Sequence, residues 1–132
     1  MTQTTCKLIT AVTVGISGCG LLGPDRREFV IQVDSVAGPT SVPANAAFEQ
    51  FFHGLVGSDG CYAFKQFNVT RSSTSADVTV VGEQVTGGGD CTTLVVYLNG
   101  KALTISPPFS DPFTLRVHQR DGGLLTKIIR VE

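Results

Sequence analysis

The sequence predicts an all-β domain, an antiparallel sandwich of seven or eight short strands, with a small barrel as the alternative. Three observations support this prediction. Val, Thr, Ser and Gly are frequent while Met is almost absent, a composition that favours strands and turns over helices. Apolar and polar residues alternate with a period of two in several segments, and turn signals separate these segments every 8 to 12 residues or so.

The first half of the predicted domain, which spans residues 29–132, contains a strand at each end of a turn-rich connection. FVIQVDSV, residues 29–36, alternates as a half-buried strand does. The connection over 38–45 carries two prolines. The segment 46–57 also alternates, although a helix over 46–53 is an open alternative.

The second half contains further strands and two predicted hairpins. Residues 61–71 and 77–85 are rich in β-branched residues and predict strands. Asn99-Gly100 stands between apolar runs, which predicts two strands paired about a tight turn. Residues 113–132 predict a second hairpin, with its turn at Asp121-Gly122-Gly123. Phe113, Leu115 and Val117 are expected to face the core.

This pattern resembles immunoglobulin-like and fibronectin type III sandwiches in architecture, although the buried tryptophan of antibody domains is missing. Charge is nearly balanced, since ten Lys and Arg stand against eleven Asp and Glu. A nucleic-acid partner is therefore not expected, because it requires a basic patch or stripe.

The N-terminal segment has the layout of a secretory signal. Lys7 precedes the uncharged run LITAVTVGISG, residues 8–18, which ends in small residues. The run is shorter than the roughly 20 apolar residues that a membrane-spanning helix needs. The alternative is that residues 8–19 form a first strand or a buried helix of the fold.

Ile16-Ser17-Gly18-Cys19 resembles the lipobox of bacterial lipoproteins, in which an aliphatic residue and two small residues precede an obligatory cysteine. The resemblance implies a diacylglycerol on the Cys19 sulfur and signal cleavage between Gly18 and Cys19. Residues 1–18 are then a signal peptide and 19–28 a lipidated tether. The implied location is the bacterial cell envelope. In lipoproteins of Gram-negative bacteria, Asp directly after the cysteine favours retention in the inner membrane. The resemblance, with Gly20 at this position, therefore slightly favours the outer membrane.

The four cysteines can be assigned under this interpretation. Cys6 leaves with the signal and Cys19 is lipidated, so Cys61 and Cys91 remain. An even remainder in an exported domain predicts one disulfide. The alternative is a metal site, but the cysteines lack the short spacings of such sites and only two histidines are available.

No residue pattern in the sequence predicts catalysis, so neither an enzyme nor a cofactor is expected. His53 and His118 fall on the polar faces of their strands, and no G-x-S-x-G motif is present. A blue-copper site would want an axial Met, and Met1 is the only methionine. GGGD, residues 87–90, lacks the following helix and Lys of a phosphate loop.

The expected function is therefore that of a membrane-anchored envelope lipoprotein with a non-catalytic binding or structural role. Its expected partners are the membrane, through Cys19, and an envelope protein. Loops over 38–45, 71–77 and 106–112 are the candidate contact regions. Within the last, Pro107, Pro108 and Phe109 predict a stiff apolar tip, the alternative being a packed connection between sheets. The second hypothesis is a small periplasmic metal-binding or enzymatic β-sandwich.

Overall fold

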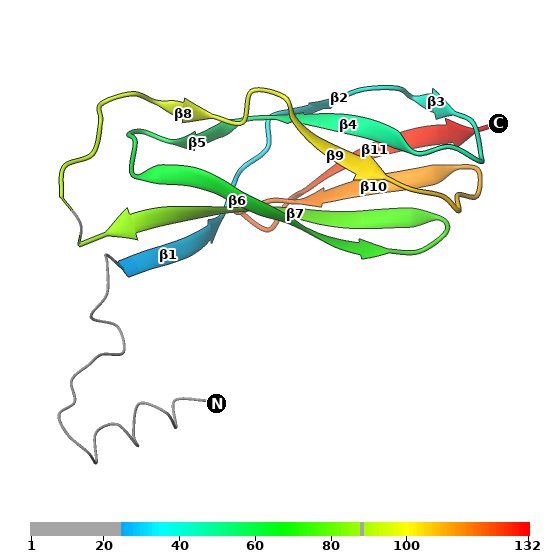
Figure 1. Cartoon of the computed structure of the whole chain (residues 1–132). Coiled ribbons are helices and arrows are strands. Elements are labelled where there is room, and N and C mark those ends of the chain that lie inside the picture. Colours follow the sequence, from blue (N-terminus) through cyan, green and yellow to red (C-terminus); the bar gives the residue numbers. More distant parts are fainter. Residues whose placement is uncertain (1–24, 88) are drawn as a thin grey trace, which may run out of the picture.

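Two layers of β-strands form the fold (Figure 1). The structure, a computed structural model, describes residues 25–87 and 89–132. Within these residues all regular structure is strand. The all-β sandwich predicted from the sequence is confirmed, with more strands than expected.

The larger layer is built around the long strand β7. Its strand order is β1-β7-β10-β11-β3, and β6 pairs with the other side of β7. The members are β1 (Asp25–Val30), β3 (Ser41–Val42), β6 (Tyr62–Arg71), β7 (Ser75–Thr86), β10 (Phe113–His118) and β11 (Leu124–Val131).

The second layer consists of two short ladders that lie end to end, because β5 directly follows β4 and β8 directly precedes β9 in the sequence. One has the order β2-β4-β9 and the other pairs β5 with β8. The strands are β2 (Ser35–Ala37), β4 (Phe48–His53), β5 (Leu55–Gly57), β8 (Val96–Tyr97) and β9 (Lys101–Ile105). Backbone bonds from Leu98 N to Gly54 O and from Gly100 N to Phe52 O join the ladders into one ribbon.

The core lies between the layers and follows the predicted alternation. On β10, Phe113, Leu115 and Val117 are buried while the residues between them are not. On β4, Phe48, Gln50 and Phe52 are buried in alternation and the backbone pairs with β2 and β9, so this segment is a strand and not the helix considered over 46–53. The complete core cluster is Ile31, Val33, Val42, Phe48, Phe52, Val56, Ala76, Val78, Val80, Leu98, Ile105, Phe109, Phe113, Leu115, Val117 and Ile129.

The larger layer is mixed, whereas the sequence predicted an antiparallel one. β10 runs parallel to β7, and β3 runs parallel to β11. β7 is long enough for two strands to pair along the same edge. β1 covers only the half of β7 from Val81 to Thr86, and β10 pairs with the remaining half, from Ser75 to Thr79.

The hairpin predicted at Asn99-Gly100 does not form. Both residues have positive φ, 54° and 76°, as a tight turn requires. However, β8 pairs with β5 and β9 pairs with β4, so the flanking strands do not pair with each other. Three residues, 98–100, lie opposite two, 53–54, and Asn99-Gly100 is therefore a bulge in a continuing strand.

The predicted boundary between tether and domain is also wrong. Residues 25–28, expected in the tether over 19–28, belong to β1, and Asp25 pairs with Thr86. Their side chains are exposed, so the segment has no apolar alternation to reveal it. Its pairing comes from the backbone and from ion pairs such as Arg26 with Glu83.

Candidate functional site

A groove of about 410 Å³ opens where the ends of β6 and β9 meet the loop 106–112. Its lining is mostly apolar, with Val69 from β6, Leu103 and Ile105 from β9, and Pro107 from the loop. The full lining is Val69, Arg71, Ser72, Leu103, Thr104, Ile105, Ser106, Pro107 and Pro108. This combination of apolar walls and a few polar groups is typical of binding sites.

Arg71, the last residue of β6, holds the wall formed by the loop. Its guanidinium donates to the carbonyl of Ser106 and, at 3.0 Å, to that of Pro108. The guanidinium carbon also lies 5.3 Å from the ring centre of Phe109 and 4.9 Å from that of Phe113. Burial lowers the pKa of Arg71 from its ordinary value. Arg71 thus fixes the loop to the end of β6.

Asp111 fixes the other end of the same loop. Its carboxylate accepts two bonds from Arg130, at 2.9 and 2.8 Å, and one from the backbone N–H of Val131 at 2.8 Å. The Arg130 guanidinium, helped by that N–H, lowers the pKa of Asp111 from 3.8 to about 2. The loop is therefore held at both ends by charge-assisted hydrogen bonds.

The predicted contact residues of this loop divide into two kinds. Pro107 and Pro108 are exposed and line the groove. Phe109 is buried and packs on Phe48 and Phe113, with ring centres 5.1 and 5.4 Å apart. Phe109 therefore does not form the exposed tip that the sequence predicted. It is a core residue, and the loop is in part a packed connection.

Two strand edges flank the groove. Among the described strands, β6 pairs with β7 alone and β9 pairs with β4 alone. Each therefore has one edge with unpaired backbone groups. Such edges accept the strand of a partner by main-chain hydrogen bonding.

A second polar cluster lies away from the groove, on β7 and β10. Asp77 accepts from Arg116 at 2.9 and 3.1 Å and bonds His118 Nε2 at 2.9 Å. Arg116, and next His118, lower the pKa of Asp77 from 3.8 to about 2. His118 is half exposed, as the sequence predicted. The Arg116–Asp77 ion pair and the His118–Asp77 hydrogen bond together tie β10 to β7.

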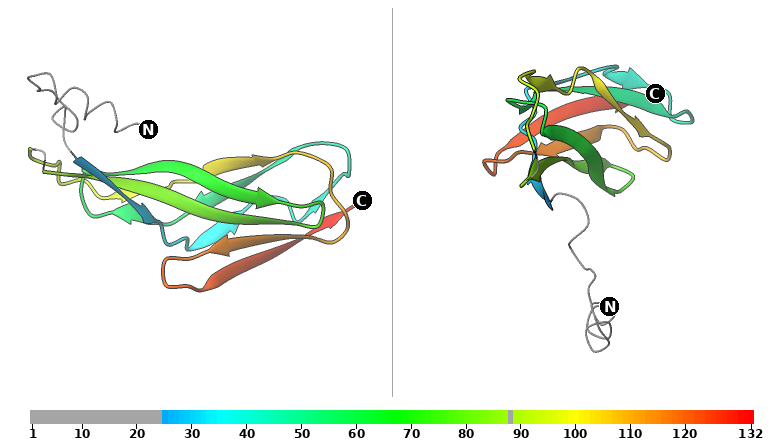
Figure 2. Two further views of the ribbon diagram at one scale, coloured as in Figure 1. Left: turned by 90° about the horizontal axis from the view of Figure 1, so that it is seen from below. Right: turned by 60° about the vertical axis from the view of Figure 1, so that its left-hand side comes forward.

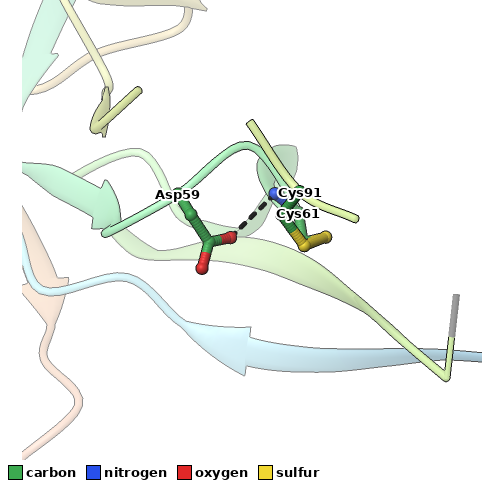
Figure 3. Close-up of side chains that lie close together, drawn as sticks. All are labelled: Asp59, Cys61 and Cys91. Carbon is green, nitrogen blue, oxygen red and sulfur yellow. Dashed lines mark hydrogen bonds between the residues drawn. A yellow bond between two sulfur atoms is a disulfide. The ribbon is translucent and has the colours of Figure 1, made fainter. Parts of the chain in front are cut away.

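Cys61 and Cys91 form a disulfide, with Cα atoms 5.2 Å apart, as predicted. Asp59 lies close to both sulfurs, so the three residues are near enough to suggest a metal site (Figure 3). Disulfide sulfurs, however, are not thiolate ligands. The Asp59 carboxylate instead accepts from the Cys61 N–H at 2.9 Å, which shapes the turn before β6.

The remaining predicted site residues, Gly18 and Cys19, lie outside the described residues. Within the described part of the chain, no helix is long and apolar enough to cross a membrane. Comparisons with family models, with curated proteins and with solved structures find no match for this chain.

Sequence reasoning missed Val69 and Leu103 as groove residues, whereas Arg71 falls within the candidate contact region 71–77. Val69 and Arg71 stand in a strand that was correctly predicted, but Leu103 comes from another layer, more than thirty residues away. The one local signal was Arg71 itself, a charged residue that ends an aromatic strand just before a polar loop.

Proposed function

We propose that this chain is a lipid-anchored protein of the bacterial cell envelope with a non-catalytic binding role. The observation that carries the proposal is the lipobox-like Ile16-Ser17-Gly18-Cys19, followed after five further residues by the first strand at Asp25. An acylated Cys19 would hold the domain close to the membrane surface, and more than one acyl chain makes such an anchor stable.

The groove is the proposed binding site, and its occupant is an extended apolar segment of an envelope protein. A strand is favoured because the groove has unpaired backbone at β6 and β9 as well as apolar walls at Val69 and Leu103. A bound strand would use both, its main chain on an edge and its alternate side chains in the groove.

The position of the groove agrees with this arrangement. β1 starts at one end of the sandwich, and the loop 106–112 lies at the other (Figures 1 and 2). A domain tethered just before Asp25 would therefore present the groove away from the membrane.

The anchoring is tested by the intact mass of the protein recovered from the membrane fraction of a bacterial host, next to a Cys19→Ala variant. The expected wild-type chain begins at Cys19 and carries two or three acyl chains, whereas the variant carries none. A wild-type chain that starts at Met1 without lipid would overturn the proposal.

Binding in the groove is tested with a synthetic peptide in which Val and Thr alternate. The measurement is the change in the NMR chemical shifts of the backbone amides when the peptide is added. We expect shifts along β6 and β9 that disappear in Val69→Lys. Ile128→Lys is the matched control, because Ile128 is a similarly exposed apolar strand residue that does not line the groove. Shifts elsewhere, or equal loss in both variants, would contradict the proposed site.

A further inference from the structure

We infer that the end of the sandwich near the start of β1 rests on the lipid surface through an apolar patch of Leu55, Leu94, Val95 and Tyr97. The inference depends on the proposed lipid anchor at Cys19. It goes further because it assigns a membrane-contacting surface to the folded domain itself.

Seven large apolar side chains among the described residues are exposed, and the patch contains four of them. Leu94 is 72% exposed, Tyr97 56%, Val95 47% and Leu55 46%. Leu55 and Tyr97 are cross-strand partners in β5 and β8, and Leu94 and Val95 immediately precede β8. Exposed apolar residues are normal when scattered, but a group of this kind marks a contact surface.

The patch lies where the anchor would place the membrane. The segment 89–95 and the start of β1 are at the same end of the molecule (Figures 1 and 2). Five residues separate Cys19 from Asp25, so the chain between them spans at most about 20 Å when extended. Lipid is therefore the apolar surface that this end of an anchored domain meets first.

The segment that carries Leu94 and Val95 is held to the body of the fold. The disulfide joins Cys91 to Cys61 at the start of β6, and the Gly60 N–H donates to the Thr92 carbonyl at 2.9 Å. A patch fixed in this way loses little conformational entropy on docking.

The polar groups beside the patch suit a lipid headgroup region. Tyr97 combines an apolar ring with a hydroxyl, a type of side chain enriched at membrane interfaces. Leu55 also lines a cavity of about 340 Å³ that contains Arg27 and Arg120. Arg27 donates to the Gln84 side chain and Arg120 to the Val30 carbonyl, and among the described residues neither is in a salt bridge. No carboxylate therefore neutralises these two positive charges, which would favour anionic headgroups near the patch.

The absence of tryptophan from the chain allows a direct test with a single inserted reporter. The full lipidated chain carrying Leu94→Trp is incorporated into vesicles of phosphatidylcholine and phosphatidylglycerol that include brominated phosphatidylcholine. We expect blue-shifted emission that the bromine quenches severalfold. The matched control is Ile128→Trp, because the native Ile128 side chain is 50% exposed and lies on β11, outside the patch. A tryptophan at this position should stay unquenched.

Each outcome of the test either supports or overturns the proposed contact between the patch and the lipid surface. Co-flotation with quenching at Leu94→Trp alone supports the inference. Co-flotation without quenching there, or with equal quenching in both variants, overturns it while leaving the anchor intact. A chain that lacks acyl groups and does not float with the vesicles overturns the anchor, and with it this inference.

Discussion

At the scale of single residues, Gln50 joins the two layers through the interior. It is fully buried on β4, its Nε2 donates to the Pro39 carbonyl at 3.0 Å, and its Oε1 accepts from Lys127 Nζ at 2.6 Å. Lys127, on β11 in the other layer, also donates to the Gly38 carbonyl. Burial lowers the pKa of Lys127 from its ordinary value, so this amine depends on its acceptors.

Replacing Gln50 alone should lower the free energy of unfolding more than replacing both Gln50 and Lys127. Gln50→Leu is expected to lower the free energy of unfolding by about 1–3 kcal/mol, because it leaves the Lys127 amine short of an acceptor. Gln50→Leu with Lys127→Met should recover much of that loss, since apolar groups of similar size need no partner. Urea unfolding of the two single variants and the double variant measures the coupling. Additive losses would contradict the prediction.

Asp77 and Asp111 should make the fold sensitive to acid. Each has a pKa of about 2 in the folded protein, below the ordinary 3.8, because of Arg116 and Arg130 respectively. The unfolded chain therefore takes up protons first as the pH falls, and the stability present above pH 3.8 is lost toward pH 2.

Unfolding experiments in urea across this pH window check the effect. The double variant Asp77→Asn with Asp111→Asn should be less stable than the wild type at neutral pH and should lose less stability on acidification. Parallel pH profiles for the two proteins would show that these carboxylates do not carry the acid response.

At the scale of elements, the disulfide closes the segment between the start of β6 and the approach to β8. It spans 30 residues, and a loop of this length corresponds to roughly 3.5 kcal/mol in the chain-entropy estimate. Cys61→Ser with Cys91→Ser should lower the free energy of unfolding by about this amount in denaturant titrations. The same titration of wild type under reducing conditions should give a matching loss, and an unchanged midpoint would contradict the prediction.

The bulge at Asn99-Gly100 gives a second prediction for an element. Gly100→Ala should destabilise the fold by about 1 kcal/mol, because φ is 76° there while an added Cβ meets only ordinary contact with His53. Gly89→Ala is the control, since a Cβ there meets open space and φ is not in the left-handed region. Thermal unfolding compares the two variants, and equal shifts would argue against backbone strain at the bulge.

These elements also show what the sequence predicts well and what it does not. Alternation correctly predicted the buried face of β10, because period two is a property of the strand itself. The Asn99-Gly100 pair correctly predicted left-handed backbone at both residues but not a hairpin, because local conformation does not determine which strands become neighbours. The disulfide was predicted because the assignment of Cys6 to the signal and Cys19 to the anchor left Cys61 and Cys91 as a pair, whereas four cysteines alone allow three pairings. The groove brings Val69 together with the distant Leu103 and Pro107 in one lining, which no local pattern contains.

At the scale of the whole molecule, the two ends of the sandwich differ in chemistry and are proposed to act separately. The end with the disulfide carries the apolar patch around Leu94, and the other end carries the groove beside Val69. Sites this far apart with no shared contacts are expected to respond independently to substitution.

The lipidated chain in vesicles should therefore show separable losses. Leu94→Asp is expected to weaken the contact between the domain and the bilayer, while binding of the alternating Val-Thr peptide stays unchanged. Val69→Lys should abolish peptide binding and leave the bilayer contact unchanged, and the double variant should show the sum of both effects. Hydrogen exchange of β6 amides reports the peptide, and quenching by brominated lipid of a tryptophan placed at Val95 reports the contact. If Leu94→Asp altered peptide binding, the two ends would be coupled through the sandwich, and the membrane would take part in binding.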